Sequence, residues 1–294
     1  MLSGRELERY DRQMMILGVE GQEKLRRAKV AVVGVGGLGS PVAYYLTAAG
    51  VGTLLLVDEQ TPELSNLNRQ ILHWEEDIDR NPKPLSAKWK LRRFNSGVEI
   101  ETFVGRLTAE NVDEVLRDVD VVVDCLDNFE TRFLLDDYVQ KRGGIPLVHG
   151  AVEGTYGQVT TIVPGKTRSL REVFPNVREK KGGKFPIIGA TAGVIGAVQA
   201  MEVIKLLTGL GEPPPEQTAH SRPRLQLLRR RRAQVEGAFT SIFSFTDVIL
   251  TVSLHDPSWV IVIFPIVGSS IEVLVITEKF IMPPTSSPRS RSRA

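Results

Sequence analysis

The sequence predicts an α/β fold built on a doubly wound, mainly parallel sheet. Three observations predict it: short β-branched runs alternate with helical segments, a glycine-rich turn follows the first run, and an aspartate ends the second. Such runs are typical of central strands in a parallel sheet, and their alternation with helices indicates right-handed crossovers. A chain of 294 residues can hold one large domain of this type, alone or with an extension.

The pattern up to residue 104 places the first strands and helices. A charged helix is expected at the N-terminus, and Pro84 is compatible with the start of a later helix because proline is tolerated in a first turn. The expected elements are a helix over 4–25, a strand near 28–33, a helix over 38–49, a strand over 53–57, a loop over 59–79, a helix over 83–95 and a strand over 98–104.

Beyond residue 104 the alternation continues and then changes. After the fourth and fifth strands the pattern predicts added antiparallel strands, and the last helix is rich in small residues that allow close packing. The expected elements are a helix over 112–116, a strand over 121–124, a helix over 129–141, a strand over 146–149, added strands within 154–164, a loop over 164–184 that ends in a basic cluster at 178–184, and a helix over 189–207.

The character of the chain changes abruptly after Gly211. Three consecutive prolines, a run of four arginines at 229–232 and a Ser/Arg-rich tail follow one another there. We therefore expect a first domain over 1–211 and an atypical segment over 212–294 that packs poorly. The segment reads like out-of-frame translation, and a genuine extension is the alternative.

Bulk composition indicates a globular protein. The net charge of +2 gives no argument for nucleic acid or for a membrane surface, and the arginine run is expected to be a solvated charge cluster. The apolar stretch 259–271 is shorter than the roughly 20 residues that a membrane helix needs. Residues 1–15 are charged, so no signal peptide is expected. A single cysteine, Cys125, excludes an intramolecular disulfide and fits a reducing, cytoplasmic setting.

The glycine-rich turn predicts a nucleotide-binding loop. It reads Gly34-x-Gly36-x-x-Gly39 after the first expected strand, and Asp58 ends the second. Glycines there let the backbone approach a phosphate or ribose, and the carboxylate can accept hydrogen bonds from ribose hydroxyls. This Rossmann-like pair alone would favour an NAD-dependent dehydrogenase. Arg69 favours a nucleotide with a phosphate chain, because a guanidinium suits phosphates better than a nicotinamide.

Further motifs stand in a fixed order around this loop. They are Arg9-Tyr10-x-Arg12-Gln13, Val57-Asp58, Ser65-Asn66-Leu67-Asn68-Arg69-Gln70, Pro82-Lys83, Asp124-Cys125-Leu126-Asp127-Asn128-Phe129-x-Thr131-Arg132 and Gly150-Ala151. Each motif is weak alone, and the ordered set is highly specific. Over about residues 5–211 the chain resembles the ThiF/MoeB/HesA family of adenylyltransferases, the bacterial and archaeal relatives of the ubiquitin-activating enzymes.

This resemblance implies adenylation of a ubiquitin-like carrier protein that ends in Gly-Gly. The terminal carboxylate attacks the α-phosphate of ATP and pyrophosphate leaves, with Mg²⁺ as the metal ion. In the family such carriers serve molybdenum cofactor synthesis, thiamin synthesis or tRNA thiolation, or modify proteins in archaea. The competing hypotheses are an NAD-dependent dehydrogenase and a non-catalytic nucleotide-binding scaffold.

The resemblance also implies roles for residues around the nucleotide. Gly37 would approach the nucleotide closely, and Asp58 would hold its ribose. Arg69 and Lys83 would bind the phosphates, with Asn66 as a neighbouring polar contact. In this chemistry the protein supplies position and charge and no covalent nucleophile.

Roles are also predicted for Asp127, Arg12 and Cys125. By resemblance Asp127 would hold Mg²⁺, although an aspartate before Asn128 can also be a helix N-cap. Arg12 would reach into the active site of the other subunit of a homodimer, whereas the sequence alone predicts an exposed basic residue. Cys125 follows a β-branched run and is expected to be a core thiol.

The chain departs from the family pattern where many relatives bind zinc. Ser169 and Glu172 stand where the usual form has cysteines, and the second cysteine pair is absent. No zinc is therefore expected, and the family's covalent transfer step lacks its usual cysteine. The four histidines show no metal-ligand spacing. Gln60 stands where the family often has an acidic residue.

Overall fold

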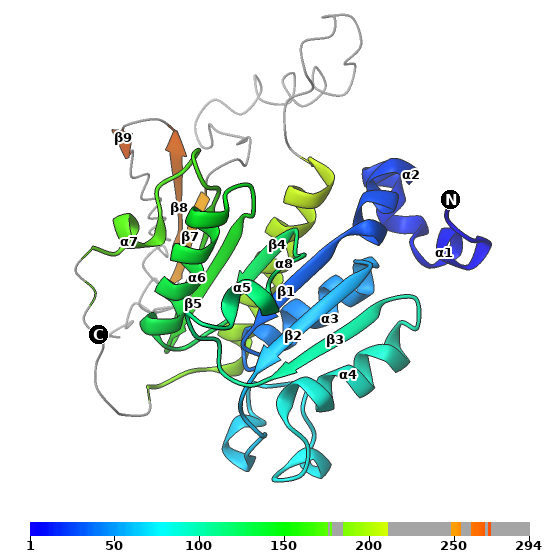
Figure 1. The fold of residues 1–294 in the computed structure, drawn as a ribbon, viewed down its shortest axis with the longest axis horizontal. Helices are drawn as coiled ribbons and strands as arrows, with labels where there is room; N and C mark the ends of the chain where they lie inside the picture. The colour runs from blue at the N-terminus through cyan, green and yellow to red at the C-terminus, as the bar shows by residue number, and fades with distance from the viewer. Residues whose placement is uncertain (176, 178–184, 211–247, 254–259, 268–269, 272–294) are drawn as a thin grey trace, which may run out of the picture.

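The strands form a sheet with the order of a doubly wound fold (Figure 1). This computed structural model describes residues 1–175, 177, 185–210, 248–253, 260–267 and 270–271. The order is β3-β2-β1-β4-β5-β6-β7-β8-β9, parallel from β3 to β5 and antiparallel at each later pair. The bounds are β1 Lys29–Val33, β2 Thr53–Asp58, β3 Glu99–Val104, β4 Val121–Asp124, β5 Leu147–Glu153, β6 Tyr156–Ile162, β7 Val248–Ser253, β8 Val260–Val267 and β9 Ser270–Ile271. The predicted fold class is confirmed.

The carboxyl ends of the central strands meet at one edge of the sheet. Val33 ends β1 and pairs with Val57 of β2 on one side and with Asp124 of β4 on the other. The segments that follow these three residues therefore leave the sheet from neighbouring points. In open parallel sheets ligands bind outside the carboxyl ends at the point where the strand order reverses, which here lies between β1 and β4.

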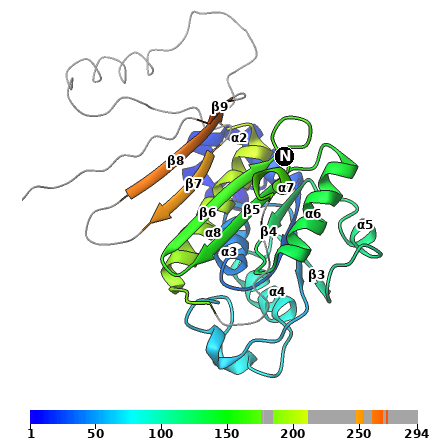
Figure 2. The ribbon, with the colours of Figure 1, turned by 90° about the vertical axis from the view of Figure 1, so that its left-hand side faces the viewer.

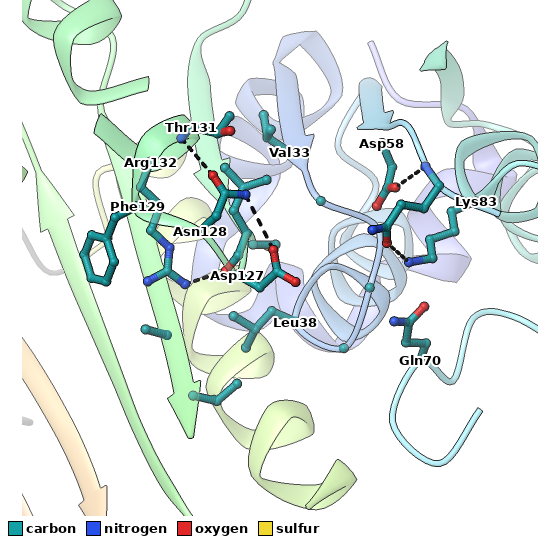
Figure 3. A pocket seen from close by; sticks show the side chains of 18 of the residues that line it. Val33, Leu38, Asp58, Gln70, Lys83, Asp127, Asn128, Phe129, Thr131 and Arg132 are labelled. Carbon is teal, nitrogen blue, oxygen red and sulfur yellow. Dashed lines mark hydrogen bonds between the residues drawn. The ribbon is translucent and has the colours of Figure 1, made fainter. Parts of the chain in front are cut away.

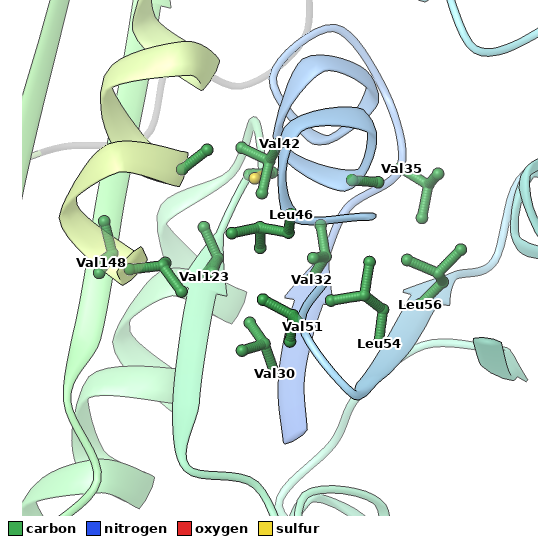
Figure 4. Close-up of a cluster of buried hydrophobic side chains, with 14 of the residues drawn as sticks. Val30, Val32, Val35, Val42, Leu46, Val51, Leu54, Leu56, Val123 and Val148 are labelled. Carbon is green, nitrogen blue, oxygen red and sulfur yellow. The ribbon is translucent and has the colours of Figure 1, made fainter. Parts of the chain in front are cut away.

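Helices cover both faces of the parallel part (Figure 2). α3, α4 and α8 pack on one face and α5 and α6 on the other. The bounds are α3 Gly39–Ala49, α4 Lys83–Phe94, α5 Val112–Val115, α6 Phe129–Arg142 and α8 Gly189–Thr208, with 3-10 turns η1 Leu64–Asn66 and η2 Glu75–Asp77 inside the predicted loop 59–79. Alternate residues of β1 supply the two cores. Val30 and Val32 pack toward α3 (Figure 4). Ala31 and Val33 pack toward α6, so both faces of β1 are buried, which explains the continuous apolar run.

By length and composition α8 is the single helix in the described part of the chain that could cross a membrane. It packs along α3 and against β5 and β6, and its residues Ala192, Ile195 and Val203 are buried in the core. A Cβ atom on Gly196 would lie 2.7 Å from the Leu38 carbonyl oxygen, so the small residue permits this close approach. Core packing therefore accounts for much of the apolar character of α8.

The N-terminal segment forms two helices where the sequence predicts one. α1 spans Gly4–Arg9 and α2 spans Asp11–Arg27. The break lies at Tyr10, whose backbone leaves the helical region at φ −104° and ψ 11°. The buried Tyr10 ring packs against Gly50, and Asn95 Nδ2 donates a hydrogen bond to its hydroxyl at 2.9 Å. A long-range contact of this kind cannot be read from local helical periodicity.

A short helix interrupts the loop predicted over 164–184. α7 spans Leu170–Val173 and begins with a capping box between Ser169 and Glu172. Arg171 donates to both carboxylate oxygens of Asp137, at 2.8 and 2.7 Å, which ties α7 to α6. The capping box is the local signal for this helix.

Several sequence-based expectations lie outside the described residues. They concern the basic cluster 178–184, the domain boundary after Gly211, the arginine run 229–232 and the Ser/Arg-rich tail. Within the segment 212–294, β7 continues the sheet by pairing with β6, and β8 pairs with β7. The division into two domains stays a prediction.

Candidate active site

A cavity of about 1160 Å³ opens at the carboxyl ends of the central strands. Seven of the ten residues that the sequence predicts for the site line it, from five separate segments. They are Gly34, Gly36, Gly37, Asp58, Arg69, Lys83 and Asp127. Figure 3 labels Asp58, Lys83 and Asp127 among them. Gly39, Asn66 and Arg12 do not line it. The structure thus brings together most of a site that is dispersed over nearly a hundred residues of sequence.

The glycine loop needs its glycines for two different reasons. Gly34 has a φ of +92°, and a Cβ atom there would lie 2.6 Å from the Cys125 carbonyl oxygen. A Cβ atom on Gly39 would collide with the Gly34 carbonyl oxygen, so Gly39 shapes the turn from inside. Gly36 and Gly37 face the cavity instead. The loop then enters α3, whose N-terminal end favours a negatively charged group.

Asp58 is oriented by the backbone on both of its oxygens. Its Oδ2 accepts a hydrogen bond from the Val35 amide at 2.8 Å, and its Oδ1 accepts one from the Gln60 amide at 2.8 Å. A carboxylate has further lone pairs beyond these two. The half-buried side chain can therefore accept hydrogen bonds from a sugar hydroxyl in the cavity.

Lys83 is a buried cation without a described anionic partner. Lys83 is 3% exposed, and its Nζ donates a hydrogen bond to the Gln60 side-chain amide oxygen at 2.7 Å. In the described part of the chain no carboxylate lies within 4.0 Å of this Nζ. Burial lowers the pKa of Lys83, and Asp58 and Asp127 oppose that effect. An ammonium in such surroundings gains stability when an anion enters the cavity.

Arg69 lines the cavity, and Asn66 supports the turn behind it. Arg69 Nη1 donates to the Ser65 carbonyl at 2.9 Å and to Asn68 Oδ1 at 3.1 Å, which leaves further guanidinium donors for a ligand. Asn66 is 9% exposed, and its Oδ1 accepts a hydrogen bond from the Glu63 amide at 3.1 Å. The structure thus gives Asn66 a turn-forming contact in addition to the ligand contact that the resemblance implies.

Asp127 lies just after the carboxyl end of β4. Its Oδ1 accepts a weak hydrogen bond from Asn128 Nδ2 at 3.5 Å, and the side chain is exposed to the cavity. Asn128 is the N-cap of α6, since its Oδ1 accepts from the Thr131 amide at 2.9 Å. Asp127 is therefore not the N-cap. The described residues hold no cluster of three metal-ligating side chains. A single carboxylate still fits Mg²⁺, which commonly binds one or two carboxylates together with substrate phosphates and water.

Arg132 belongs to one of the sequence motifs, and the structure gives it a supporting role. Arg132 is 5% exposed and donates from Nη2 to the carbonyls of Leu126 and Gly150, the latter at 3.3 Å. Its Nε lies 3.7 Å from Asp124 Oδ2. Arg132 therefore fixes the backbone immediately before Asp127. The sequence could have indicated this role, because Arg132 follows Asp127 closely in the chain. Residues at the start of α6 fold back over the loop between β4 and α6.

The buried centre beneath this loop is polar and closed. Asp124 and His149 are both 0% exposed, with 2.6 Å between Asp124 Oδ2 and His149 Nδ1. Burial lowers the pKa of His149 and raises that of the Cys125 thiol. Cys125 lies in the hydrophobic core, as the sequence predicted.

Arg12 lies away from the cavity of its own chain. It is an exposed residue of α2, the helix that leads into the amino end of β1 (Figure 1). The cavity is at the carboxyl end of the same strand. A contact between Arg12 and a nucleotide would thus need a second copy of the chain.

Comparison with known proteins shows the family of this chain. The ThiF family model matches residues 10–238. The SAMP-activating enzyme E1 of Haloferax volcanii is 43% identical over 219 residues, which cover 72% of this chain and 79% of that protein. The sulfur carrier protein adenylyltransferase of Thermus thermophilus is 42% identical over 221 residues, covering 71% and 80%. The crystal structure of E. coli MccB with ATP matches at a TM-score of 0.60 and 26% identity, over 72% of this chain and 66% of that one. By its motifs, its fold and its relatives, this chain belongs to the ThiF family.

Proposed function

We propose that this chain is an ATP-dependent adenylyltransferase that activates the C-terminal glycine of a ubiquitin-like carrier protein. One observation carries the proposal: Lys83, a buried cation without a described anionic partner, faces a cavity framed by a glycine loop and Arg69. This arrangement suits the phosphate chain of a nucleotide. The names of the two curated relatives support the reaction and its substrate class.

In the proposed reaction a carboxylate oxygen of the carrier attacks the α-phosphorus of ATP. The new bond joins the acyl oxygen to phosphorus, and the bond to the β-phosphate breaks with its electron pair leaving on pyrophosphate. Arg69 and Lys83 neutralise charge on the phosphates, and Asp58 orients the ribose. Asp127 would hold Mg²⁺, which when bound adds positive charge beside the phosphates.

The lining of the cavity supports a peptide as the second substrate. Beyond the nucleotide loop its wall continues over Ala151 and Gln158, on β5 and β6, to Phe185 and Ile187. The two glycines at the end of such a tail carry no side chains that could clash with this wall of the cavity. The carrier would belong to a molybdenum cofactor, thiamin or tRNA thiolation pathway, and the reaction would take place in the cytoplasm.

A homodimer would complete the site by adding Arg12 from the second subunit. α2 carries Arg12 and also exposes three apolar side chains, Met15, Ile16 and Val19, at 69%, 73% and 54%. Met15 and Ile16 precede the kink at Gly18 and Val19 follows it. Exposed apolar groups gathered on one segment are typical of an interface. We also propose that no structural zinc binds, because Ser169 and Glu172 are engaged with each other in the capping box of α7.

Pyrophosphate exchange tests the proposal directly. Labelled pyrophosphate should enter ATP when Mg²⁺ and a carrier ending in Gly-Gly are both present, and a carrier lacking its last glycine is the matched control. Binding of NADH without any response to Mg·ATP would instead support the dehydrogenase. ATP binding without exchange by any carrier would support the scaffold.

Subunit complementation tests the role of Arg12. Arg12→Ala and Lys83→Met should each be inactive alone. Mixed dimers should regain exchange, because one of their two sites then holds both native residues. No recovery in verified mixed dimers would contradict the contribution in trans.

A further inference from the structure

A chain of buried polar side chains joins α4 to the glycine loop. His73, Ser86, Lys90 and Asp77 are each 3–5% exposed. Lys90 Nζ forms an ion pair with Asp77 and donates to Ser86 Oγ at 2.9 Å. Ser86 Oγ lies 3.0 Å from His73 Nδ1, and His73 Nε2 lies 2.7 Å from the carbonyl oxygen of Val35. The chain thus ends on the backbone of the nucleotide loop.

The donors and acceptors along this chain have one consistent direction. The Val35 carbonyl oxygen only accepts, so His73 carries a proton on Nε2 and donates it to Val35. A neutral ring then accepts at Nδ1 from Ser86 Oγ, which in turn accepts from the Lys90 ammonium. Burial lowers the pKa of His73 to about 4, with Lys90 and Lys83 acting in the same direction and Asp77 opposing them. The ring is therefore neutral at neutral pH, as this direction requires.

The same residues connect the two parts of the site that face phosphates. Val35 stands between Gly34 and Gly36, and its amide is held by Asp58 while its carbonyl is held by His73. On the other side, Ser86 and Lys90 follow Lys83 by three and seven residues on α4 and so share its helix face. A shift of α4 against the loop would break the contact between Ser86 and His73.

We infer that His73 is a positioning residue that fixes the glycine loop relative to Lys83, so that both hold the phosphate chain of ATP at the same time. The inference rests on the proposed function. The side chain of His73 is not among those that line the cavity, so its effect passes through the loop and through α4. Its removal should therefore weaken binding of the triphosphate more than binding of a monophosphate.

The test compares ATP and AMP binding by titration calorimetry in variants of the full chain. His73→Leu leaves the Val35 carbonyl without its donor and should weaken ATP binding about tenfold, with AMP affected about threefold or less. His73→Gln can donate from Nε2 to the same carbonyl and should restore most of the ATP affinity. Ser86→Ala removes the contact between α4 and the His73 ring and should cause an intermediate loss of ATP affinity. This variant also tests the inference if His73→Leu does not fold.

Asn95→Leu is the matched control. Asn95 is 2% exposed at the far end of α4 and donates to the Thr47 carbonyl at 2.9 Å, so it is a buried polar residue of the same kind that does not touch the loop. This variant should lose thermal stability and keep its ATP affinity within about twofold. Combining His73→Leu with Lys83→Met should add little to the loss that Lys83→Met causes alone, because the two effects share one path.

The outcomes separate this inference from the proposed function. Wild-type ATP affinity in His73→Leu, equal losses for ATP and AMP without rescue by glutamine, or additive losses in the double variant would each overturn the positioning role. Wild-type protein that binds ATP but never exchanges pyrophosphate would refute the adenylation instead. The predicted ATP-selective loss in His73→Leu would stand in that case.

Discussion

Replacing Lys83 by methionine should weaken ATP binding strongly and leave the protein folded. Lys83 is buried, and its described polar partner is the neutral Gln60 amide. An ammonium in this position has lost hydration without gaining a close counter-charge. A methionine of similar size should therefore leave the free energy of unfolding unchanged or raise it by about 1 kcal/mol.

The expected loss of affinity follows from the charge. At about 4 Å and an effective dielectric constant of about 20, an ammonium and one phosphate charge attract each other by about 4 kcal/mol. Since about 1.4 kcal/mol corresponds to a factor of ten, Lys83→Met should weaken ATP binding by roughly 10²- to 10³-fold after screening by solvent. Calorimetric titration with Mg·ATP measures this change.

Lys90→Met is the matched control for stability. Lys90 lies on the same helix and is as deeply buried, but it is paired with the buried Asp77. Its removal leaves a carboxylate without its partner and should lower the free energy of unfolding by about 3–5 kcal/mol in urea titrations. The reasoning is refuted if Lys83→Met loses as much stability as Lys90→Met, or if it binds ATP like the wild type.

Other variants test the metal ligand, the loop support and the buried histidine. Asp127→Asn should raise the Mg²⁺ concentration needed for half-maximal exchange by about tenfold or more, and an unchanged requirement would remove Asp127 from the metal site. Arg132→Ala should lower the free energy of unfolding by about 3 kcal/mol in urea titrations, because the buried Asp124 then loses its arginine partner and keeps His149. Between pH 6.5 and about 4 the unfolded chain binds a proton that folded His73 does not, so stability should fall by about 3 kcal/mol as the pH falls through this range. His73→Gln should flatten this part of a urea-derived stability profile, and an equally steep profile would assign the proton to another group.

The sequence predicted the strands and helices closely because each has its own local signal. The β-branched run 121–124 and the glycine turn after Val33 depend only on neighbouring residues, and the structure has both where expected. That Asp58 and Asp127 line the same cavity was also predictable, because carboxyl ends of parallel strands share one edge. The break at Tyr10 was not predictable, since it depends on burial against a helix end forty residues away.

The supporting contacts of the site escaped prediction for a similar reason. In the sequence Gln60 is only a departure from the family pattern, and in the structure its amide oxygen accepts a hydrogen bond from Lys83. His73 was expected to be an ordinary core or solvated histidine, and its partners, Ser86 and the Val35 carbonyl, are brought to it only by folding. Motifs identify residues that touch ligands, whereas residues that hold those residues in place are visible only as contacts.

Positive and negative side chains both line the cavity. Four cationic and five anionic side chains of the described residues line it, so its wall has no excess of positive charge. They are Arg69, Lys83, Arg106 and Arg132, and Asp58, Glu59, Asp127, Glu130 and Glu153. Arg106 pairs with Glu130 at 2.7 Å, and Arg132 is bound to backbone carbonyls, which leaves Lys83 and Arg69 to meet phosphates.

Free ATP in this cavity would be attracted by Lys83 and repelled by Asp127. A divalent cation held by Asp127 would turn that repulsion into attraction, because it would add positive charge beside the phosphates. Asp127→Asn should accordingly have opposite effects in two conditions: tighter binding of ATP than the wild type in a chelator, and weaker binding in Mg²⁺. A variant that weakens ATP binding equally in both conditions would show that Asp127 acts through the fold of the loop and not through the metal.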